Sequence, residues 1–437
     1  MRETLELQKK AFIENGQPSY NQRLDSLKRC IALLETHDVQ IVEALNEDYK
    51  NRSETEIMTS EVIQSIRNLN FTIKNLKKWM KPSRRPSSFM ADLLGSKALM
   101  QPSPLGTVGI IAPWNFPIGM VFYPTASILA AGNRIMVKPS EFTPNTASLI
   151  KEAVGKYFDE SEFAVFLGGP EVGAEFTALP LDHLLYTGSG AVARKVVANA
   201  ATNLVPTTLE LGGKSANVAL NDADPVLVAK KAIGACHQNS GQTCSALTRL
   251  IIPKSMSEEV YKIIADKNDT YSVGDPLDEN TRCGPMVSLR QQKSVTKYIE
   301  SGINEGATLI SGGLGKPDGI IKGYYVKPTV FADVTPEMKI WKEEIFGPVL
   351  VITTYDDEDE AIMLANDSVY GLSGGVWSKD EERAIRFAKL MRTGQVSVNG
   401  GAFNISAPFG GYKHSGNGRE LGTHGLDEFL EIKSIQL

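Results

Sequence analysis

Cysteine is scarce in this sequence, which has 437 residues and only four cysteines, at positions 30, 236, 244 and 283. They show no CxxC pair and no metal-ligand spacing, which excludes a disulfide-rich secreted scaffold and gives no support to a zinc site. The five histidines form no metal motif either. We therefore expect no metal, and a reducing, cytoplasmic location that keeps the thiols free.

Long apolar runs and a surplus of positive charge are also missing. The apolar runs are strand-sized, and none approaches the roughly 18 residues of a membrane span. The first 20 residues are polar and charged, so we expect no signal peptide and no membrane partner. The formal net charge is −5, from 46 basic and 51 acidic residues, which gives no electrostatic case for nucleic acid. These absences favour a soluble enzyme-like protein.

What the sequence does contain is an alternation of strands and helices. The chain is too long for one core, so two or three domains are expected. Residues 22–80 predict two amphipathic helices. Beyond them, the predicted buried strands are 108–112, 135–138, 164–167, 184–187, 207–211, 217–220, 247–252 and 349–354, and the predicted helices include 226–235, 256–267 and 288–305. A Gly-rich connection is expected at 306–323, and a strand at 429–437. The pattern predicts a mostly parallel sheet that binds ligands beyond the carboxyl ends of its strands.

One cysteine and one glutamate are the candidate catalytic pair. Cys244 lies among small and polar residues, three positions after Gly241, which indicates a reachable nucleophilic thiol. The alternative is a buried cysteine that only fills space. Glu210 is a charged residue inside an apolar strand, directly before a Gly-Gly corner. Burial there would raise its pKa toward neutrality and suit it to act as a general base.

Three loops that follow predicted strands contain candidate binding residues. Asn115 lies on a stiff loop between aromatic residues and prolines, which suits an oxyanion-hole donor beside the backbone N–H of Cys244. Glu141 could accept hydrogen bonds from a ribose diol while Lys138 holds a neighbouring hydroxyl or phosphate. The segment that begins at Gly188 has the form G-x-G-x-x-A and opens a helix, which is typical of a pyrophosphate contact. A surface turn is the alternative for each loop.

Six segments together resemble the aldehyde dehydrogenase superfamily. In chain order they are PWNFP (113–117), KPSE (138–141), LELGGK (209–214), GQTC (241–244), EEIFGP (343–348) and PFGGYKHSGNGRE (408–420). The resemblance covers the chain from about residue 20 onward. The segments SEFTPNT and ALPLDHLLYTGS look most like the coniferyl aldehyde dehydrogenase or class 3-like branch, whereas PFGGYKHSGNGRE looks more like class 1 and 2 enzymes.

The resemblance implies an α/β fold with three parts. A Rossmann-type parallel-sheet domain for NAD(P) would comprise residues 1–84 and 104–211, and an α/β catalytic domain residues 212–422. Oligomerisation strands would lie in residues 85–103 and 423–437. In the family such strands build a sheet shared between subunits, so we expect a homodimer or a dimer of dimers.

The resemblance also assigns the site residues. Cys244, Glu210 and Asn115 would be catalytic. The cofactor, NAD with NADP as the alternative, would contact Ile111, Pro113, Trp114, Lys138, Ser140, Glu141, Gly188, Ser189, Gly212, Glu344 and Phe346. The aldehyde would occupy a tunnel lined by Phe116, Tyr123, Phe403 and Phe409. Glu344 would grip the nicotinamide ribose, and Glu141 favours NAD because it would repel a 2′-phosphate.

The predicted reaction is oxidation of an aldehyde to a carboxylic acid through a thiohemiacetal and a thioester on Cys244. An aromatic tunnel favours an aromatic or hydrophobic aldehyde similar to coniferyl aldehyde; an aliphatic aldehyde or semialdehyde is the alternative. A CoA-acylating enzyme would not need Glu210, and a redox-free hydrolase would leave the segments KPSE and EEIFGP unexplained. A Cys244–His237 pair is the other alternative, but the Glu210 assignment leaves His237 no necessary role. An inactive binding or structural protein would not be expected to keep all the catalytic residues.

Overall fold

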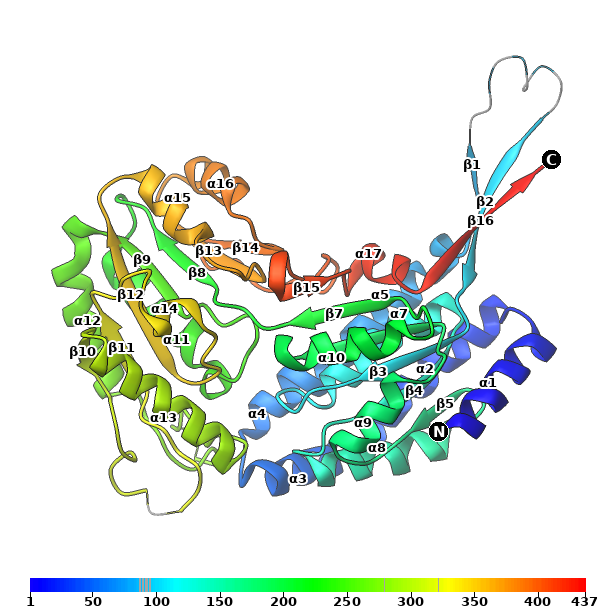
Figure 1. Ribbon diagram of the computed structural model, residues 1–437, viewed down its shortest axis with the longest axis horizontal. Coiled ribbons are helices and arrows are strands. Elements are labelled where there is room, and N and C mark those ends of the chain that lie inside the picture. The colour runs from blue at the N-terminus through cyan, green and yellow to red at the C-terminus, as the bar shows by residue number, and fades with distance from the viewer. Residues whose placement is uncertain (86–87, 89, 91–92, 94–95, 279, 321) are drawn as a thin grey trace.

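The computed structural model describes residues 1–85, 88, 90, 93, 96–278, 280–320 and 322–437. Two α/β lobes lie side by side, and a narrow three-stranded sheet projects from one of them (Figure 1). The chain passes from the first lobe to the second directly after strand β7, through Gly212 and Gly213. The predicted α/β fold with parallel sheets is confirmed.

The first lobe is built on a six-stranded sheet with the order β15-β7-β6-β3-β4-β5. Its strands are β3 (Thr107–Ile111), β4 (Arg134–Lys138), β5 (Phe163–Val165), β6 (His183–Gly188), β7 (Thr207–Leu211) and β15 (Gly416–Asn417). β3 to β7 are parallel, and β15 returns from the far end of the chain to pair antiparallel with β7. The crossover helices are α7 (Gly119–Ala131), α8 (Pro144–Tyr157), α9 (Pro170–Thr177) and α10 (Gly190–Ala201). The five predicted strands of this region are present.

The helices before this sheet are more numerous than predicted. They are α1 (Arg2–Asn15), α2 (Tyr20–Thr36), α3 (Asp38–Tyr49), α4 (Glu54–Ile57), the π-helical turn η1 (Met58–Val62) and α5 (Ile63–Trp79). The two predicted helices correspond to α2 and α5, so the expectation of only two helices in residues 22–80 was wrong. Helix α3 buries only Ile41, Leu45 and Tyr49, one residue per turn, which is too narrow a stripe to stand out as an amphipathic pattern.

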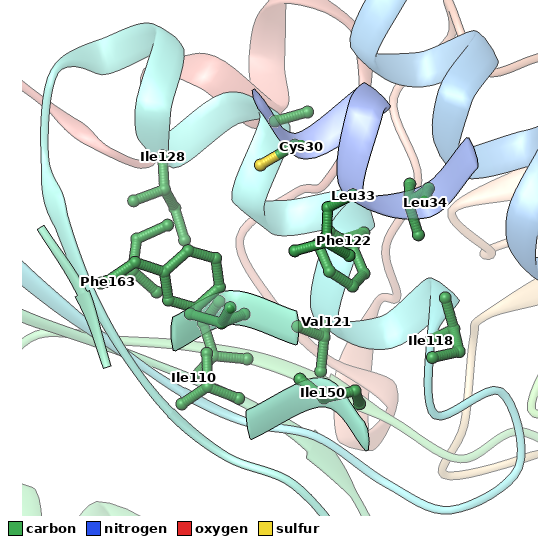
Figure 2. Packing of buried hydrophobic residues seen from close by; sticks show 14 of the residues in the cluster. Cys30, Leu33, Leu34, Ile110, Ile118, Val121, Phe122, Ile128, Ile150 and Phe163 are labelled. Carbon is green, nitrogen blue, oxygen red and sulfur yellow. The ribbon is translucent and has the colours of Figure 1, made fainter. Parts of the chain in front are cut away.

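Helix α7 lies inside the first lobe rather than on its surface. Eleven of its thirteen residues are buried, because helix α2 covers one side of it and the sheet covers the other. Leu33 of α2, Phe122 of α7 and Ile110 of β3 belong to one buried hydrophobic cluster (Figure 2). A helix that is apolar on all sides is stable only when it is enclosed in this way. The enclosure fixes the start of α7, and with it the loop that carries Asn115.

The second lobe is built on a seven-stranded sheet with the order β10-β11-β12-β9-β8-β13-β14. Its strands are β8 (Ala216–Ala219), β9 (Arg249–Pro253), β10 (Thr308–Ser311), β11 (Thr329–Ala332), β12 (Val349–Tyr355), β13 (Ser373–Trp377) and β14 (Gln395–Val398). The longer helices around it are α11 (Pro225–His237), α12 (Ser257–Asp269), α13 (Leu289–Asn304), α15 (Glu358–Asn366) and α16 (Glu381–Leu390). β10 is antiparallel to β11. It lies within residues 306–323, so the prediction of a Gly-rich connection was wrong for the residues of this strand. Its first two residues are exposed, so it lacks the apolar run of a buried strand.

The projecting sheet joins β2 (Ala98–Pro104) to β1 (Ser83–Arg85) on one side and to β16 (Leu430–Gln436) on the other. Both pairings are antiparallel, and β16 pairs with β2 over its whole length. The predicted C-terminal strand is therefore confirmed. Part of the predicted hairpin at 85–103 falls on residues outside the described ones.

Candidate active site

Glu210 is the next-to-last residue of strand β7, just before the chain leaves the first sheet. It is 3% exposed and pairs through its backbone with Gly416 of β15. Neither carboxylate oxygen has a hydrogen-bond partner among the described residues. Burial raises the pKa of Glu210 well above its ordinary value; the Glu420 charge raises it further and Arg419 opposes the shift. The predicted raised pKa is thus present, and the carboxyl group is free to gain and lose a proton.

The segment 408–420 closes over this carboxylate. A Cβ atom at Gly410 would lie 2.7 Å from the nearer Glu210 oxygen, and Gly410 has a φ of +150°. Only glycine satisfies both the space and the conformation. Glu420 follows on the same segment, and burial raises the pKa of its carboxyl to about 7. Two neighbouring carboxyl groups with raised pKa values are an arrangement found where proton transfer takes place.

Cys244 follows the short helical turn η2 (Gln238–Gly241). It keeps intermediate exposure, whereas Cys30, Cys236 and Cys283 are buried; all four lack a disulfide. Desolvation by the surrounding protein nevertheless raises the pKa of its thiol to about 12, and the negative charges of Glu344 and Glu210 also raise it. The resting thiol is therefore protonated at neutral pH, and it becomes a nucleophile only when its proton is removed.

The loop before the thiol is held by Gln242, which is fully buried. Its side-chain amide donates to the carbonyl of Asn239 at 3.1 Å and of Pro285 at 3.3 Å. Its side-chain oxygen accepts from the N–H of Val287 at 2.9 Å. Asn239 and Ser240 both have positive φ, which for residues other than glycine is uncommon outside functional loops. Gln242 thus stabilises a constrained backbone directly before the candidate nucleophile.

Asn115 lies beside this loop and is 4% exposed. Its side-chain amide donates to the carbonyl of Gln242 at 3.1 Å, and its backbone carbonyl accepts from the Asn239 side chain at 3.2 Å. The structure therefore brings Asn115 to the backbone two residues before Cys244.

The predicted cofactor residues of the first lobe lie at the carboxyl ends of neighbouring strands. Ile111 at the end of β3 is in register with Lys138 of β4 and with Tyr186 of β6. Lys138 is buried and pairs with Glu141 at 2.8 Å. The Ser140 hydroxyl accepts from the N–H of Phe142 at 3.2 Å. Pro113 lies two residues after the end of β3.

The loop after β6 ends in a helix N-terminus. Ser189 caps α10 by accepting from the N–H of Val192 at 3.4 Å. Gly188 precedes it, and a Cβ atom there would lie 2.4 Å from the Tyr186 hydroxyl. The uncovered backbone N–H groups and the positive end of the helix dipole suit an anionic group such as a pyrophosphate.

Residues of the second lobe complete this edge. Glu344 accepts a hydrogen bond from the N–H of Gly213 at 3.1 Å, and its carboxylate fills the space beside Gly212. Burial raises the pKa of Glu344 to about 7, against the opposing effects of that N–H and of Lys214. Phe346 contacts Trp114 edge to face, with ring centroids 5.3 Å apart. The segments 343–348 and 113–117 therefore meet across the two lobes.

The four predicted tunnel residues form two separate groups. Phe403 and Phe409 contact each other edge to face, with centroids 6.0 Å apart, and Phe403 is 52% exposed. Phe116 instead lies against the guanidinium of Arg52 at 5.0 Å, and the Tyr123 hydroxyl donates to the carbonyl of Ser60. The second group is thus fastened to the N-terminal helices.

Sequence reasoning assigned no role to Gln242, Glu420 or Lys214, although each lies in or beside a recognised segment. Lys214 is 2% exposed, and burial lowers the pKa of its ammonium to about 7. A polar residue within a Gly-rich segment was the available signal. His237 is a core residue that contacts Asn268 at 2.8 Å, and burial lowers its pKa to about 4. It does not serve as a partner of Cys244.

Two absences concern only the part of the chain that the structure describes. There, no group of three or more His, Cys, Asp or Glu side chains could hold a metal ion. Within the same residues, no helix is long and apolar enough to cross a membrane. The site therefore contains a thiol, carboxyl groups, and a set of polar groups at the carboxyl ends of the strands.

The polar groups at the carboxyl ends of the strands fit a dinucleotide. A buried lysine beside a carboxylate ends β4, a capped helix N-terminus follows β6, and a second carboxylate lies at the lobe junction. These groups suit ribose hydroxyls, a pyrophosphate and a second ribose respectively. Parallel α/β sheets bind such cofactors at this edge.

Two curated relatives are similar to the chain. One is a 3-succinoylsemialdehyde-pyridine dehydrogenase of a Pseudomonas species, 45% identical over 339 residues, which are 76% of this chain and 70% of that protein. Another is a probable coniferyl aldehyde dehydrogenase of Caulobacter vibrioides, 37% identical over 441 residues, which cover 100% of this chain and 90% of that protein.

Solved structures show the same likeness. Aldehyde dehydrogenase C of Pseudomonas syringae, a mutant in complex with NAD+ and octanal, has a TM-score of 0.92 and 35% identity over 99% of this chain and 87% of that one. An aldehyde dehydrogenase of Mycobacterium tuberculosis with NAD+ has a TM-score of 0.92 and 36% identity over 99% and 89%. The family model "Aldehyde dehydrogenase family" matches residues 2–435. The chain therefore belongs to the aldehyde dehydrogenase family and is an NAD-dependent aldehyde dehydrogenase.

Proposed function

We propose that the chain oxidises a hydrophobic, preferably aromatic, aldehyde to its carboxylic acid through covalent intermediates on Cys244. The observations that carry this proposal are the buried, unpartnered carboxyl of Glu210 and the partly exposed thiol of Cys244. Burial raises the pKa of the Cys244 thiol to about 12, and the charges of Glu344 and Glu210 raise it further. A base with a raised pKa is what a protonated thiol and a later water molecule both need.

The first step forms a bond between the Cys244 sulfur and the aldehyde carbon. Glu210 accepts the thiol proton, and the carbonyl oxygen becomes an oxyanion that Asn115 and the Cys244 N–H stabilise. NAD, when bound, supplies the acceptor for the hydride that leaves this carbon; Lys138, Glu141, Ser189 and Glu344 are the residues that would hold it. Loss of the hydride leaves a thioester on Cys244.

The second step hydrolyses the thioester. Glu210 passes the first proton to solvent, then takes a proton from water as the water oxygen attacks the thioester carbon. Collapse of the second oxyanion breaks the carbon–sulfur bond and releases the carboxylic acid. The raised pKa of Glu210 suits it to both tasks, since a strongly acidic carboxyl would be a poor proton acceptor.

The contact between Phe403 and Phe409 supports an aromatic substrate. So do two relatives, whose names specify coniferyl aldehyde and a pyridine semialdehyde. Octanal in a similar structure favours the alternative of an aliphatic aldehyde. Phe116 and Tyr123, held against the N-terminal helices, are proposed as the other wall.

We also propose a homodimer or a dimer of dimers that joins through the projecting sheet. β16 is an edge strand with Ile432 51% exposed, and an uncovered edge of this kind can pair with a second chain. A cytoplasmic location is proposed because the Cys244 mechanism needs a reduced thiol.

The test is NADH formation with a panel of aromatic, aliphatic and semialdehyde substrates. Aromatic aldehydes are expected to have the highest kcat/KM, by roughly tenfold or more over short aliphatic ones. Cys244→Ala should form no NADH, and Asn115→Ala should lose roughly 100- to 1,000-fold in turnover. Equal kcat/KM for all classes would contradict the substrate proposal, and a fully active Cys244→Ala would contradict the mechanism.

A further inference from the structure

The loop that carries Asn115 contacts helix α3 and the segment that follows this helix. The Tyr49 hydroxyl donates to the carbonyl of Trp114. The Arg52 guanidinium lies 5.0 Å from the centre of the Phe116 ring. These contacts hold the residues immediately before and after Asn115, and so restrict its backbone on both sides.

Glu61 holds the end of the same loop. One of its carboxylate oxygens accepts from the N–H of Ile118 at 2.7 Å and from the N–H of Gly119 at 3.3 Å. These are the first free N–H groups of helix α7, where a negative charge is favourable. The other oxygen pairs with Arg52 at 2.6 Å. The two residues therefore form one unit that contacts the loop on either side of Pro117.

The local backbone of Glu61 is unusual. It lies in the π-helical turn η1, between α4 and α5. Such turns are rare and often occur at functional sites. The neighbouring Ser60 carbonyl accepts from the Tyr123 hydroxyl, so the turn contacts both the start and the first turns of α7.

The Arg52–Glu61 pair is costly to bury, because the two side chains are 3% and 0% exposed. A buried ion pair is often no more stabilising than apolar residues of similar size. Stability alone therefore does not explain it. What the pair provides that apolar residues cannot is a directed set of contacts to two backbone N–H groups and to the faces of two aromatic rings, those of Tyr49 and Phe116.

We propose that Arg52 and Glu61 are positioning residues, which set the side-chain amide of Asn115 at the place where the oxyanion forms. This inference rests on the proposed function, in which Asn115 is an oxyanion donor. From the opposite side, Asn239 and Gln242 tie Asn115 to the nucleophile loop. The amide is thus held between the nucleophile loop and the ion pair. Donors of this kind work only when they are placed before the reaction begins.

The principal test is Glu61→Gln, which keeps the size of the side chain but removes its charge. We expect kcat to fall by roughly 10- to 100-fold, because a small misplacement of a transition-state donor has an effect of this size. The Kd for NAD and the KM for aldehyde should stay within about twofold. In an Asn115→Ala background, Glu61→Gln should cause little further loss of kcat, since both variants remove the same contribution.

A matched control is Glu162→Gln, which also removes the carboxylate of an arginine pair, the one with Arg29 at 2.9 Å. It lies in the same lobe, and both of its carboxylate oxygens accept from Arg29, so the kcat of this variant should equal that of the wild type. If Glu61→Gln does not fold, Arg52→Lys replaces it. Lysine keeps the charge but loses the planar group on Phe116, and kcat should fall by roughly three- to tenfold.

The outcomes are distinguishable. Full turnover of Asn115→Ala contradicts the proposed function, and the inference with it. An impaired Asn115→Ala beside a fully active Glu61→Gln, or a fully active Arg52→Lys, overturns the inference alone. Losses that multiply in the Asn115→Ala, Glu61→Gln double variant would also overturn it, because Glu61 would then act independently of Asn115.

Discussion

Glu61 and Glu210 are two buried glutamates whose surroundings are opposite. Glu61 is 0% exposed, pairs with Arg52 at 2.6 Å and accepts from two backbone N–H groups. Glu210 is 3% exposed, and neither of its oxygens has a hydrogen-bond partner within the described chain. One carboxylate is held in place, and the other is left free.

The two environments act differently on the pKa and on the position of each carboxylate. Burial raises the pKa of Glu61, but Arg52 and the two N–H groups oppose that effect and keep the carboxylate in one place. For Glu210, burial and the Glu420 charge act in the same direction, and only Arg419 opposes them. A satisfied carboxylate supports structure, whereas an unsatisfied one can exchange protons. An unpartnered buried acid is therefore the better indicator of catalysis in this chain.

The largest expected effect comes from removing the free carboxyl. Glu210→Gln should lower steady-state turnover by roughly 100- to 10,000-fold, because a positioned general base contributes about that much. The free energy of unfolding should change by less than about 1 kcal/mol, since glutamine replaces a carboxyl that burial already favours in its neutral form. Steady-state NADH formation and urea unfolding measure the two quantities. Turnover within tenfold of wild type would contradict the base assignment.

A large loss of stability is expected instead when the partner of the other glutamate is removed. Arg52→Met should lower the free energy of unfolding by about 3–5 kcal/mol, because it leaves the Glu61 charge buried and unpaired. Adding Glu61→Leu to this variant should restore much of the loss. Urea denaturation of the two variants gives the comparison. A cost below about 1 kcal/mol for Arg52→Met would mean that the pair behaves like an exposed one.

The smallest effect is expected from Glu420→Gln, which removes the charge that helps to raise the pKa of Glu210. The acid limb of the pH–turnover profile should therefore move to lower pH. An unmoved limb would mean that burial alone sets the Glu210 pKa.

The same variant makes a prediction about stability. The folded-state pKa of Glu420, raised to about 7, means that the folded protein binds this proton more tightly than the unfolded chain. Its stabilising contribution is full below the ordinary carboxyl pKa and is lost as pH rises through about 7. Glu420→Gln should flatten that decline, as urea unfolding at a series of pH values would show.

Much of the framework follows from local pattern. Apolar runs predicted strands β3 to β7, and helical spacing predicted α2 and α5, because burial on a sheet or a helix face repeats at short intervals along the chain. Six segments in order identified the family and indicated Cys244 and Glu210 as candidate catalytic residues. Elements with little local signal were missed: α3 buries one residue per turn, and the first two residues of β10 are exposed.

The sequence by itself determined the elements with a strong local pattern, the family and the candidate chemistry, since each depends on short segments of the chain. Only the tertiary structure decided which buried acid is paired. Glu210 and Glu420 are far apart in sequence and meet because β15 returns to β7. Arg52 and Glu61 are unremarkable in sequence and become a pair only when α3, the π-helical turn and α7 pack together. Charge pairing depends on distance and burial, and these exist only in the folded chain.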